Sequence, residues 1–387
     1  MNILFLLKNI SVGGVEVVTS VLANKFIEEN HHVVIWAFYK GEVTLDDRLD
    51  NRIKIVYGSG FTASNENAES LLNTLRDNRI DVVINQWALP PQTTSLLKKV
   101  LKQYYVRIIS VHHSDPMTNG RLKNIESDMQ KTTNPLIHCI LGVKRFFYKY
   151  ITSYSFRRCY QLSDKFVVLS ESYKQHFTDF ANVKDDGKLI SIANPVTIDT
   201  HSDTNPEGKL KHILYVGRLE CENKKPDRVL KVWSKIENNA PDWSLDIVGD
   251  GPDKERLEKL ANDMQLKHCH FCGYQNPVSY YKQSPIMLLT SDFEGFPLVL
   301  VEAMSCGVIP VVYGSFTAAD DIIDNGINGV VIPKGKQGFD VELMASNVKR
   351  LMDEADGDVF SKMSHAAVEK SKNYSLDKIY NLWMDVL

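Results

Sequence analysis

Apolar runs rich in β-branched residues alternate with amphipathic stretches along the first half of the chain. The apolar runs lie at 3–7, 33–38, 82–85, 107–111 and 166–170. Between the first two of these runs, Val18, Leu22 and Phe26 recur at the spacing of a helix with one buried face. Strands that alternate with amphipathic helices form a parallel sheet covered by helices, so the pattern predicts an α/β domain.

The same alternation begins again after Asn194-Pro195. The later apolar runs lie at 212–217, 245–249, 269–273, 286–290, 308–313 and 329–333. We therefore predict two Rossmann-like, doubly wound domains at 1–195 and 196–370, followed by a C-terminal helix at 371–387 that packs back on the first domain. The stretch 194–208 contains two prolines and is the expected hinge. Ligands bind at the carboxyl ends of such strands, so the site is expected between the two domains.

The composition of the 387 residues is typical of a globular protein, with 43% hydrophobic and 24% charged residues. The net charge of −3 is unevenly divided, because residues 1–195 hold 24 Lys+Arg and 19 Asp+Glu whereas the remainder holds 21 and 29. The first half should therefore prefer an anionic neighbour such as a membrane surface or a polyanionic acceptor. Nucleic acid normally requires a more basic patch, and no nucleic-acid partner is expected.

The sequence predicts a cytoplasmic protein or one at the periphery of a membrane. The first apolar run follows no basic region and precedes no small-residue cleavage site, so it indicates a strand rather than a signal peptide. No apolar stretch approaches the roughly 20 residues that span a bilayer. Six scattered cysteines fit a reducing compartment, and the Cys269/Cys272 pair lacks a second pair at zinc-binding spacing.

Two glutamates flank a Gly-Phe-Pro turn in the stretch SDFEGFPLVLVEAM, residues 291–304. Pro297 suits a first helical position, because its φ is already fixed and it lacks an N–H that would have no partner there. We predict a helix that begins at 297 or 298, whose free N–H groups suit phosphate oxygens. Glu294 then lies in the loop before the helix, and Glu302 lies a little over one turn inside it. The plainer alternative is one solvated loop acid and one partly exposed helix acid.

A basic loop follows the apolar run at 212–217. Gly217 lets the backbone bend at the edge of the sheet, and Arg218 with Lys224 or Lys225 places cations beside that edge. Arginine binds phosphate oxygens through two parallel hydrogen bonds and lysine adds a compact charge, so the loop suits a diphosphate without a metal. A solvated loop of lysines and glutamates is the alternative.

Glycines follow a strand at two further places. Gly13 and Gly14 come after the first strand, where they permit a ligand to approach and expose N–H groups at the start of the next helix. A tight connection alone also explains them. Gly249 and Gly251 follow a later strand, but Lys254 occupies the position of the third glycine in a dinucleotide fingerprint. A tight turn beside a ligand explains this pair equally well.

Two histidines, His112 and His113, stand at the end of the strand that begins at 107. A histidine on an apolar strand is often structural, but strand ends are where ligands bind in this class of fold. One of the two is expected to point toward the site, and strand alternation does not decide which.

Together these motifs resemble the GT-B-type retaining glycosyltransferases of family 4. The resemblance covers nearly the whole chain and depends on the order and spacing of GGVE, VHHS, IANPV, VGRL with its lysines, VGDGP, FCGY and SDFEGFPLVLVEAMSCGVIPVV. It implies the GT-B architecture, in which two Rossmann-like domains face each other across a cleft.

The resemblance also implies a role for each acid and cation. Glu294 would contact the hydroxyls of the donor sugar, and Glu302 would accept hydrogen bonds from the ribose of the nucleotide. Arg218 and Lys224 resemble the pair that binds the donor diphosphate in this family. Lys225 remains a candidate, because the lysine belongs to a doublet.

Further positions of the donor site follow from the same resemblance. His112 matches the histidine that reaches the donor sugar, although the neighbouring His113 leaves that assignment open. Gly13 and Gly14 would form the loop that meets the donor phosphate and the acceptor. The remaining donor contacts would come from Gly273, Tyr274, Gly295, Phe296, Pro297, Leu298 and Val299.

The implied reaction moves a hexose from a nucleotide diphosphate sugar, most often a UDP-sugar, to a hydroxyl of a glycan or glycolipid with retention at the anomeric carbon. Such enzymes assemble bacterial surface polysaccharide or lipopolysaccharide, and no cofactor or divalent metal is expected. Two rival functions use the same architecture: a nucleotide-sugar epimerase, which needs no acceptor, and a non-catalytic sensor of sugar nucleotides.

The stretch 131–160 combines six Lys+Arg with seven aromatic residues and contains no Asp or Glu. Basic residues interleaved with aromatic residues suit a helix on an anionic membrane, where a lipid-linked acceptor would lie. An ordinary helix with its aromatic residues in the core is the alternative.

Overall fold

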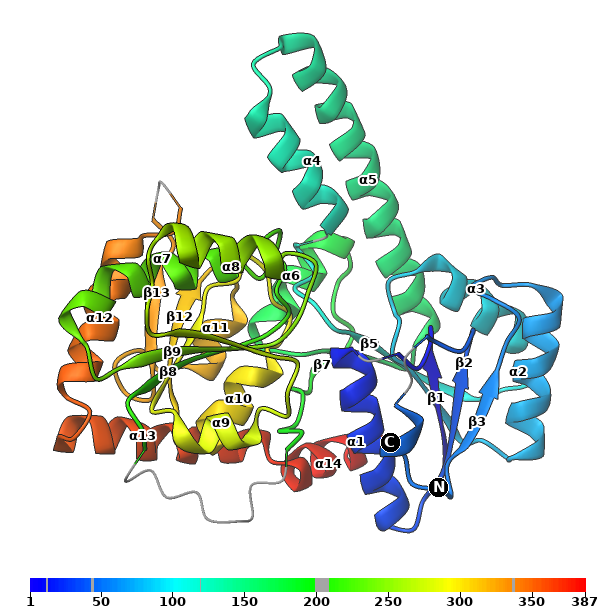
Figure 1. The fold of residues 1–387 in the computed structure, drawn as a ribbon. Coiled ribbons are helices and arrows are strands. Elements are labelled where there is room, and N and C mark those ends of the chain that lie inside the picture. The colour runs from blue at the N-terminus through cyan, green and yellow to red at the C-terminus, as the bar shows by residue number, and fades with distance from the viewer. Residues whose placement is uncertain (12, 43–44, 119, 199–208, 336–337) are drawn as a thin grey trace. The chain divides into compact units, whose positions relative to one another are not determined.

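The computed structural model describes residues 1–11, 13–42, 45–118, 120–198, 209–335 and 338–387 (Figure 1). These residues form two compact units, Met1–Asn194 with Ile379–Leu387 and Pro195–Lys378. The sequence predicted a boundary after residue 195 and a separate final segment at 371–387. Of the predicted hinge, residues 199–208 lie outside the described part of the chain.

The first unit contains a parallel sheet of seven strands in the order β3-β2-β1-β4-β5-β6-β7. Its strands are β1 (Asn2–Leu7), β2 (His32–Ala37), β3 (Lys54–Tyr57), β4 (Val82–Asn85), β5 (Arg107–His112), β6 (Lys165–Val168) and β7 (Leu189–Ser191). Its helices are α1 (Gly14–Glu28), α2 (Asn65–Asp77), α3 (Pro91–Val100), α4 (Gly120–Lys131), α5 (Pro135–Leu162) and α6 (Ser172–Ala181), with a 3-10 turn at Asp46–Arg48.

The second unit contains a parallel sheet of six strands in the order β10-β9-β8-β11-β12-β13. Its strands are β8 (His212–Val216), β9 (Ser244–Val248), β10 (Cys269–Gly273), β11 (Ile286–Leu289), β12 (Ile309–Gly314) and β13 (Val330–Pro333). The helices after β8 are α7 (Pro226–Ile236), α8 (Lys254–Asp263), α9 (Val278–Gln283), α10 (Leu298–Ser305), α11 (Ala318–Ile322), α12 (Val341–Asp353), α13 (Asp358–Ser371) and α14 (Leu376–Met384), with 3-10 turns at Glu237–Asn239 and Lys372–Tyr374.

Alternate residues of the central strands pack into cores on the two faces of each sheet. In the second unit, Ile213 and Tyr215 of β8 join the core beneath α7, α8 and α12, whereas Leu214 and Val216 join the core beneath α9 and α10. In each sheet the strand order reverses direction beside the first strand, as in a doubly wound fold. The predicted α/β class with two doubly wound parallel sheets is confirmed.

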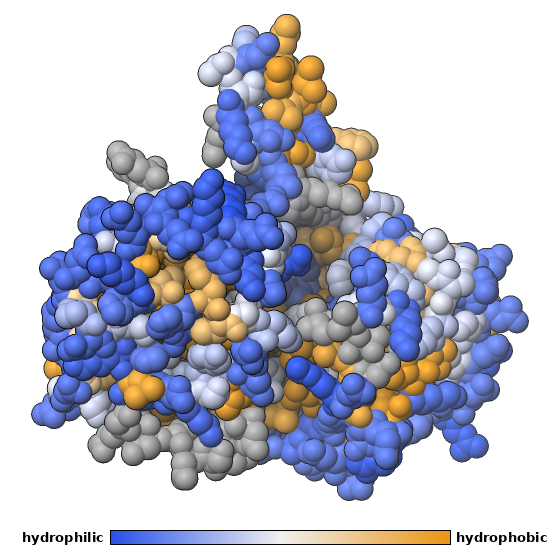
Figure 2. All heavy atoms as spheres, in the orientation of Figure 1, coloured by the Kyte–Doolittle hydropathy of each residue, from blue (hydrophilic) through white to orange (hydrophobic). Residues whose placement is uncertain are grey.

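Helices α4 and α5 form a hairpin that extends away from the sheet of the first unit (Figure 1). The end of α5 nearest the sheet is buried, with Phe156 and Tyr160 in the core, but Phe146, Tyr150 and Tyr154 are exposed. The alternative of an ordinary helix with its aromatic residues in the core therefore holds at the end of α5 nearest the sheet and is wrong for the rest of the helix. Figure 2 shows hydrophobic atoms along this hairpin.

The last nine residues complete the core of the first unit. Tyr380 hydrogen-bonds His31 through its hydroxyl at 3.1 Å and packs its ring on Phe26, with the ring centroids 5.3 Å apart. Trp383 is buried, and Arg107 donates a hydrogen bond to the carbonyl of Leu387. Burial of these aromatic rings supplies the stabilisation that holds this segment in the unit.

Candidate functional site

Three glycines lie in a row at the carboxyl ends of β8, β9 and β10. The N–H of Gly217 donates to the carbonyl of Val248 at 3.0 Å, and the N–H of Gly249 donates to the carbonyl of Gly273 at 2.8 Å. A Cβ at Gly249, where φ is +148°, would lie 1.9 Å from the carbonyl oxygen of Gly217. A Cβ at Gly251 would likewise lie 2.5 Å from a backbone oxygen of the loop after β8. The close approach of two backbone segments therefore requires these glycines, and no ligand need be invoked.

Lys224 and Glu294 form the central ion pair of the second unit. The Nζ of Lys224 donates to both carboxylate oxygens of Glu294, each at 2.8 Å. Glu294 is 6% exposed, whereas the Lys224 side chain is about one-third exposed at 34%. A buried carboxylate requires such a partner, because an unpaired charge in this environment costs several kcal/mol. The pair brings together one predicted cation and one predicted acid from segments 70 residues apart.

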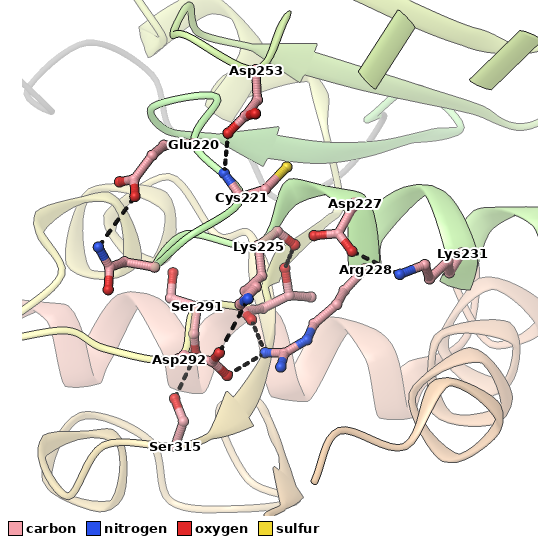
Figure 3. A network of polar contacts seen from close by, with 12 residues as sticks. Glu220, Cys221, Lys225, Asp227, Arg228, Lys231, Asp253, Ser291, Asp292 and Ser315 are labelled. Atoms are coloured by element: carbon pink, nitrogen blue, oxygen red, sulfur yellow. Dashed lines mark hydrogen bonds and ion pairs between the residues drawn. The ribbon is translucent and has the colours of Figure 1, made fainter. Parts of the chain in front are cut away.

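Lys225 pairs with Asp292 (Figure 3) and not with the acid that binds Lys224. Its backbone has a positive φ of +53° at the N-cap of α7, and its Nζ lies 3.7 Å from Asp292 Oδ2. Asp292 also accepts a hydrogen bond from Arg228 at 2.6 Å, and Arg228 donates to the carbonyl of Thr290 at 2.9 Å. The two adjacent lysines therefore pair with two different acids. Asp292 and Arg228 were not predicted from the sequence.

Arg218 is exposed at the carboxyl end of β8. Its backbone position is fixed by the hydroxyl of the buried Tyr215, which donates to the Arg218 carbonyl at 3.2 Å. Within the described part of the chain, no hydrogen bond or ion pair is observed for the Arg218 guanidinium. The guanidinium thus remains available for an anionic ligand.

The helix α10 begins where the Gly-Phe-Pro turn predicted. Pro297 is the N-cap residue with an extended φ of −71° and ψ of 105°, and its own side chain makes no capping hydrogen bond. Phe296 is buried and packs against Tyr374, with the ring centroids 5.3 Å apart, which fixes the entry of the chain into the helix. Leu298 and Val299 provide the first-turn N–H groups of α10, next to the half-buried Gly295. Uncapped N–H groups of this kind suit anionic oxygens.

Glu302 lies in the interior of α10 and is 6% exposed, so the alternative of a partly exposed acid is wrong. Its Oε1 accepts from the Thr197 hydroxyl, and its Oε2 accepts from the Tyr281 hydroxyl at 3.1 Å. Burial raises the pKa of Glu302, and these two hydrogen bonds oppose that rise. Each carboxylate oxygen keeps a second lone pair, so the group can still accept from a ligand hydroxyl.

A pocket of about 520 Å³ opens at the carboxyl ends of β12 and β13. It is lined by residues that include Gly314, Ser315, Phe316 and Asp320. Ser315 donates to the carbonyl of Ser291 at 2.5 Å, which links the pocket wall to the Asp292 loop. A volume of this size is typical of sites for small organic ligands. The sequence analysis did not predict this pocket, whose Gly314 is the last residue of β12.

The other predicted donor contact in the second unit is at the end of β10. Gly273 has a φ of +71°, which favours glycine, and Tyr274 beside it is 68% exposed. An exposed aromatic ring at a strand end offers a flat surface for a nucleotide base.

In the first unit, an acid occupies the glycine-rich start of α1. Gly13 is the N-cap residue, and a Cβ there would lie 2.5 Å from the carboxylate oxygen Oε2 of Glu16. Glu16 is buried, and burial raises its pKa. Gly13 therefore makes room for the Glu16 side chain, whereas a Cβ at Gly14 would meet open space. A side chain of this kind at a helix N-terminus interacts favourably with the helix dipole.

His112 and His113 at the end of β5 are both held as neutral groups. His112 is 5% exposed, its Nε2 lies 3.0 Å from the Ser114 hydroxyl, and its ring meets Phe156 edge to face at 4.7 Å. The Nε2 of His113 lies 2.6 Å from Gln86 Oε1. Burial lowers the pKa of His112 to about 3 and that of His113 to about 4. Neither ring can therefore supply a proton at neutral pH as an imidazolium.

The second unit thus gathers most of the predicted donor residues along one edge of its sheet. The carboxyl ends of β8, β10 and β11 carry Arg218, Gly273 and Glu294, and α10 carries Glu302. The sequence did not predict Asp292, which pairs with Lys225 and Arg228, or the Thr197 and Tyr281 hydroxyls, which hydrogen-bond Glu302. A signal was available only for Asp292, since it stands two residues before Glu294 at the end of an apolar run.

Two family models match the chain. The model described as "Glycosyl transferases group 1" matches residues 197–373, and the model described as "Glycosyltransferase Family 4" matches residues 12–200. The two matches together leave only short segments at the ends of the chain.

Individual proteins give the same result. An uncharacterized glycosyltransferase of Haemophilus influenzae is 32% identical over 58% of this chain and 61% of its own length, so the chain spans less than two thirds of that relative. A Campylobacter jejuni enzyme is 22% identical over 100% of this chain and 98% of its own length, and it is named as an α-1,4-N-acetyl-D-galactosaminyltransferase acting on a GalNAc-containing diNAcBac-PP-undecaprenol. The structure of S. aureus TarM, in a complex that contains UDP, superimposes with a TM-score of 0.73 and 14% identity over 100% of this chain and 99% of its own.

Proposed function

Because the chain belongs to the GT-B-type glycosyltransferases related to family 4, we propose that it moves a hexose from a nucleotide diphosphate sugar to a hydroxyl of a glycan or glycolipid. The donor in this proposal is a UDP-sugar. The chemistry of the second unit supports such a donor, because it offers cations for a diphosphate and buried acids for sugar hydroxyls. The presence of UDP in the TarM complex fits the same choice of nucleotide.

The observation that carries the proposal is the ion pair between Lys224 and Glu294, in the same unit as the hydrogen-bonded Glu302. In the donor complex, Lys224 and Arg218 would bind the diphosphate, and the first-turn N–H groups of α10 would add to their charge. Glu294 would accept hydrogen bonds from hydroxyls of the hexose. Glu302 would accept them from the ribose, and Tyr274 would offer its ring to the base.

The chemistry follows from where charge develops. When the bond between the anomeric carbon and the phosphate oxygen breaks, negative charge appears on the diphosphate, and fixed cations stabilise it there. Arg218 and Lys224 would take the part of a divalent metal, so we propose a metal-independent reaction. The acceptor hydroxyl would attack from the face that the diphosphate leaves, and a departing phosphate oxygen would take its proton, which retains the anomeric configuration.

A route through a covalent glycosyl-enzyme would instead need a nucleophilic carboxylate beside the sugar. Glu294 has both carboxylate oxygens engaged by Lys224, which fits an acid that holds hydroxyls better than one that attacks carbon. For the acceptor, we propose a growing bacterial surface glycan, in lipopolysaccharide or capsule assembly. The undecaprenol-linked acceptor in the name of the Campylobacter relative supports a lipid-linked form of that glycan at the inner face of the cytoplasmic membrane.

The proposal predicts that UDP is released from a UDP-hexose only when an acceptor is present. The measurement is a coupled assay for UDP, run across a panel of UDP-sugars with and without a lipid-linked or soluble glycan acceptor. The matching donor should also raise the melting temperature of the protein, because a ligand that binds only the folded state stabilises it. A new free nucleotide sugar formed without acceptor would indicate an epimerase instead. Donor binding with no turnover under any acceptor would indicate a sensor.

A further inference from the structure

One face of α5 is apolar and faces solvent along most of the helical hairpin. Six residues form this face, which we call the apolar stripe: Leu136, Ile140, Val143, Phe147, Tyr150 and Tyr154. They follow one another at intervals of four and three residues, which places them on one side of the helix. Each is at least half exposed, from 50% at Tyr154 to 75% at Leu136. The stripe extends for about 27 Å along the helix.

We propose that the hairpin of α4 and α5 docks on an anionic lipid membrane through the apolar stripe. A contiguous exposed apolar surface of this size marks an interaction site in a folded protein. Tyrosine and phenylalanine rings suit the boundary between headgroups and acyl chains, because their apolar bodies leave water while a tyrosine hydroxyl stays in contact with it.

The charge of the hairpin identifies the partner. Residues 120–162 contain eight Lys+Arg and two Asp+Glu, whereas the rest of residues 1–195 contains 16 and 17. The whole positive excess of the N-terminal half therefore lies in the hairpin. Anionic lipids attract such a segment by about 1 kcal/mol for each basic residue near the surface.

Individual cations lie where headgroups would meet them. Lys144 is exposed one turn from both Ile140 and Phe147, so it flanks the stripe. Arg158 lies over the ring of Tyr154, with its guanidinium carbon 5.8 Å from the ring centroid. Long basic side chains beside an apolar face can extend to the headgroups while their aliphatic parts stay on the apolar surface.

The apolar stripe could instead pack against the same stripe of a second copy of the chain, because apolar residues at intervals of four and three also form coiled coils. The charges of α5 argue against such a dimer. α5 contains five Lys+Arg and no Asp or Glu, so two such helices side by side would offer no opposite charges across the seam. Two hairpins with a positive excess would repel each other, whereas an anionic leaflet neutralises them.

The contact would be peripheral. Within the described residues no helix, α5 included, combines the length and apolarity that crossing a bilayer requires. The inference stands apart from the proposed transfer reaction, because it depends on a surface of the first unit that carries none of the proposed donor contacts. It would nevertheless keep the enzyme beside a lipid-linked acceptor.

Co-sedimentation of the full chain with lipid vesicles tests the inference. Equimolar phosphatidylglycerol and phosphatidylcholine vesicles should bind the protein at low salt, and pure phosphatidylcholine vesicles should bind it weakly. The double variant Phe147→Ser with Tyr150→Ser should lower the partition coefficient at least about tenfold, because it removes two aromatic anchors. Lys144→Glu should lower it about fivefold or more. The matched controls are Tyr105→Ser, at a tyrosine that is 81% exposed elsewhere in the unit, and Lys98→Glu on α3, and both should bind as the wild type does.

Two results would overturn the inference: no binding to anionic vesicles at low salt, or equal binding by the stripe variants and the wild type. Sedimentation velocity without lipid adds a third, because dimers that disappear in the Phe147/Tyr150 variant would assign the stripe to a second copy. Transfer to a soluble acceptor should be unchanged in every stripe variant. A variant that loses vesicle binding but keeps transfer bears on this inference alone. A variant that loses transfer but keeps vesicle binding bears on the proposed function alone.

Discussion

We expect Glu294→Gln to lower the turnover number of the proposed hexose transfer about 100- to 1,000-fold, the loss typical of removing one preorganised group from a reacting centre. The substitution keeps the size of the side chain and one oxygen that can accept from Lys224. In the wild type, the Nζ of Lys224 lies 2.8 Å from both carboxylate oxygens. It removes the negative charge and one acceptor for the sugar hydroxyls. Steady-state kinetics with the identified donor and acceptor measures the effect.

Two controls distinguish a loss of catalysis from a loss of folding or of nucleotide binding. The melting temperature of Glu294→Gln should match that of the wild type within a few degrees, and its affinity for UDP should change little, because the residue is proposed to contact the hexose. Glu255→Gln, at an exposed acid on α8, should turn over as the wild type does. Turnover by Glu294→Gln within about threefold of the wild type would remove Glu294 from the reaction, because so small a loss is far below that expected for a preorganised catalytic group.

We expect acidification from pH 6.5 to pH 4 to destabilise the first unit strongly. In the unfolded chain His112 and His113 bind protons near pH 6.5, but in the folded chain burial lowers their pKa to about 3 and about 4. Unfolding therefore takes up protons throughout this window. Each histidine lowers the free energy of unfolding as the pH falls, with a slope that approaches about 1.4 kcal/mol per pH unit below the unfolded pKa, and the loss ends only near the folded pKa.

Urea unfolding at pH 7, 6 and 5 measures this dependence. Between pH 6 and pH 5, His113→Gln should reduce the slope by about 1 kcal/mol per pH unit, because a neutral side chain cannot take up the proton. His138→Gln, at an exposed histidine on α5, should leave the slope unchanged. Equal slopes in the wild type and His113→Gln would mean that His113 titrates normally in the folded state.

The sequence predicted the elements that depend on local chemistry. Pro297 has its φ fixed and follows a Gly-Phe pair, so the start of α10 and the place of Glu302 within it could be derived without a structure. The alternation of apolar runs likewise determined the class of both sheets, because buried parallel strands and amphipathic helices have different periods.

The contacts that could not be predicted from the sequence join segments that lie far apart in the chain. Lys224 and Lys225 are adjacent, yet they pair with Glu294 and Asp292, which lie about 70 residues further along the chain. Arg228 meets Asp292 across 64 residues, and no local pattern relates them. The glycine at 249 suggested a ligand, but the nearby carbonyl of Gly217 explains it. In α5 the helical period indicated an amphipathic helix without showing which of its aromatic residues another element would cover.

The central claim is that the second unit binds the donor diphosphate at the carboxyl ends of its strands. Calorimetric titration of UDP into the wild type and Arg218→Ala tests it most directly, because the exposed Arg218 side chain can be removed without breaking an observed contact in the described residues. We predict binding about 10- to 100-fold weaker in Arg218→Ala, the equivalent of one charge-assisted phosphate contact, and unchanged binding in the control Arg256→Ala on α8. Equal UDP affinity in the wild type and Arg218→Ala would contradict the account.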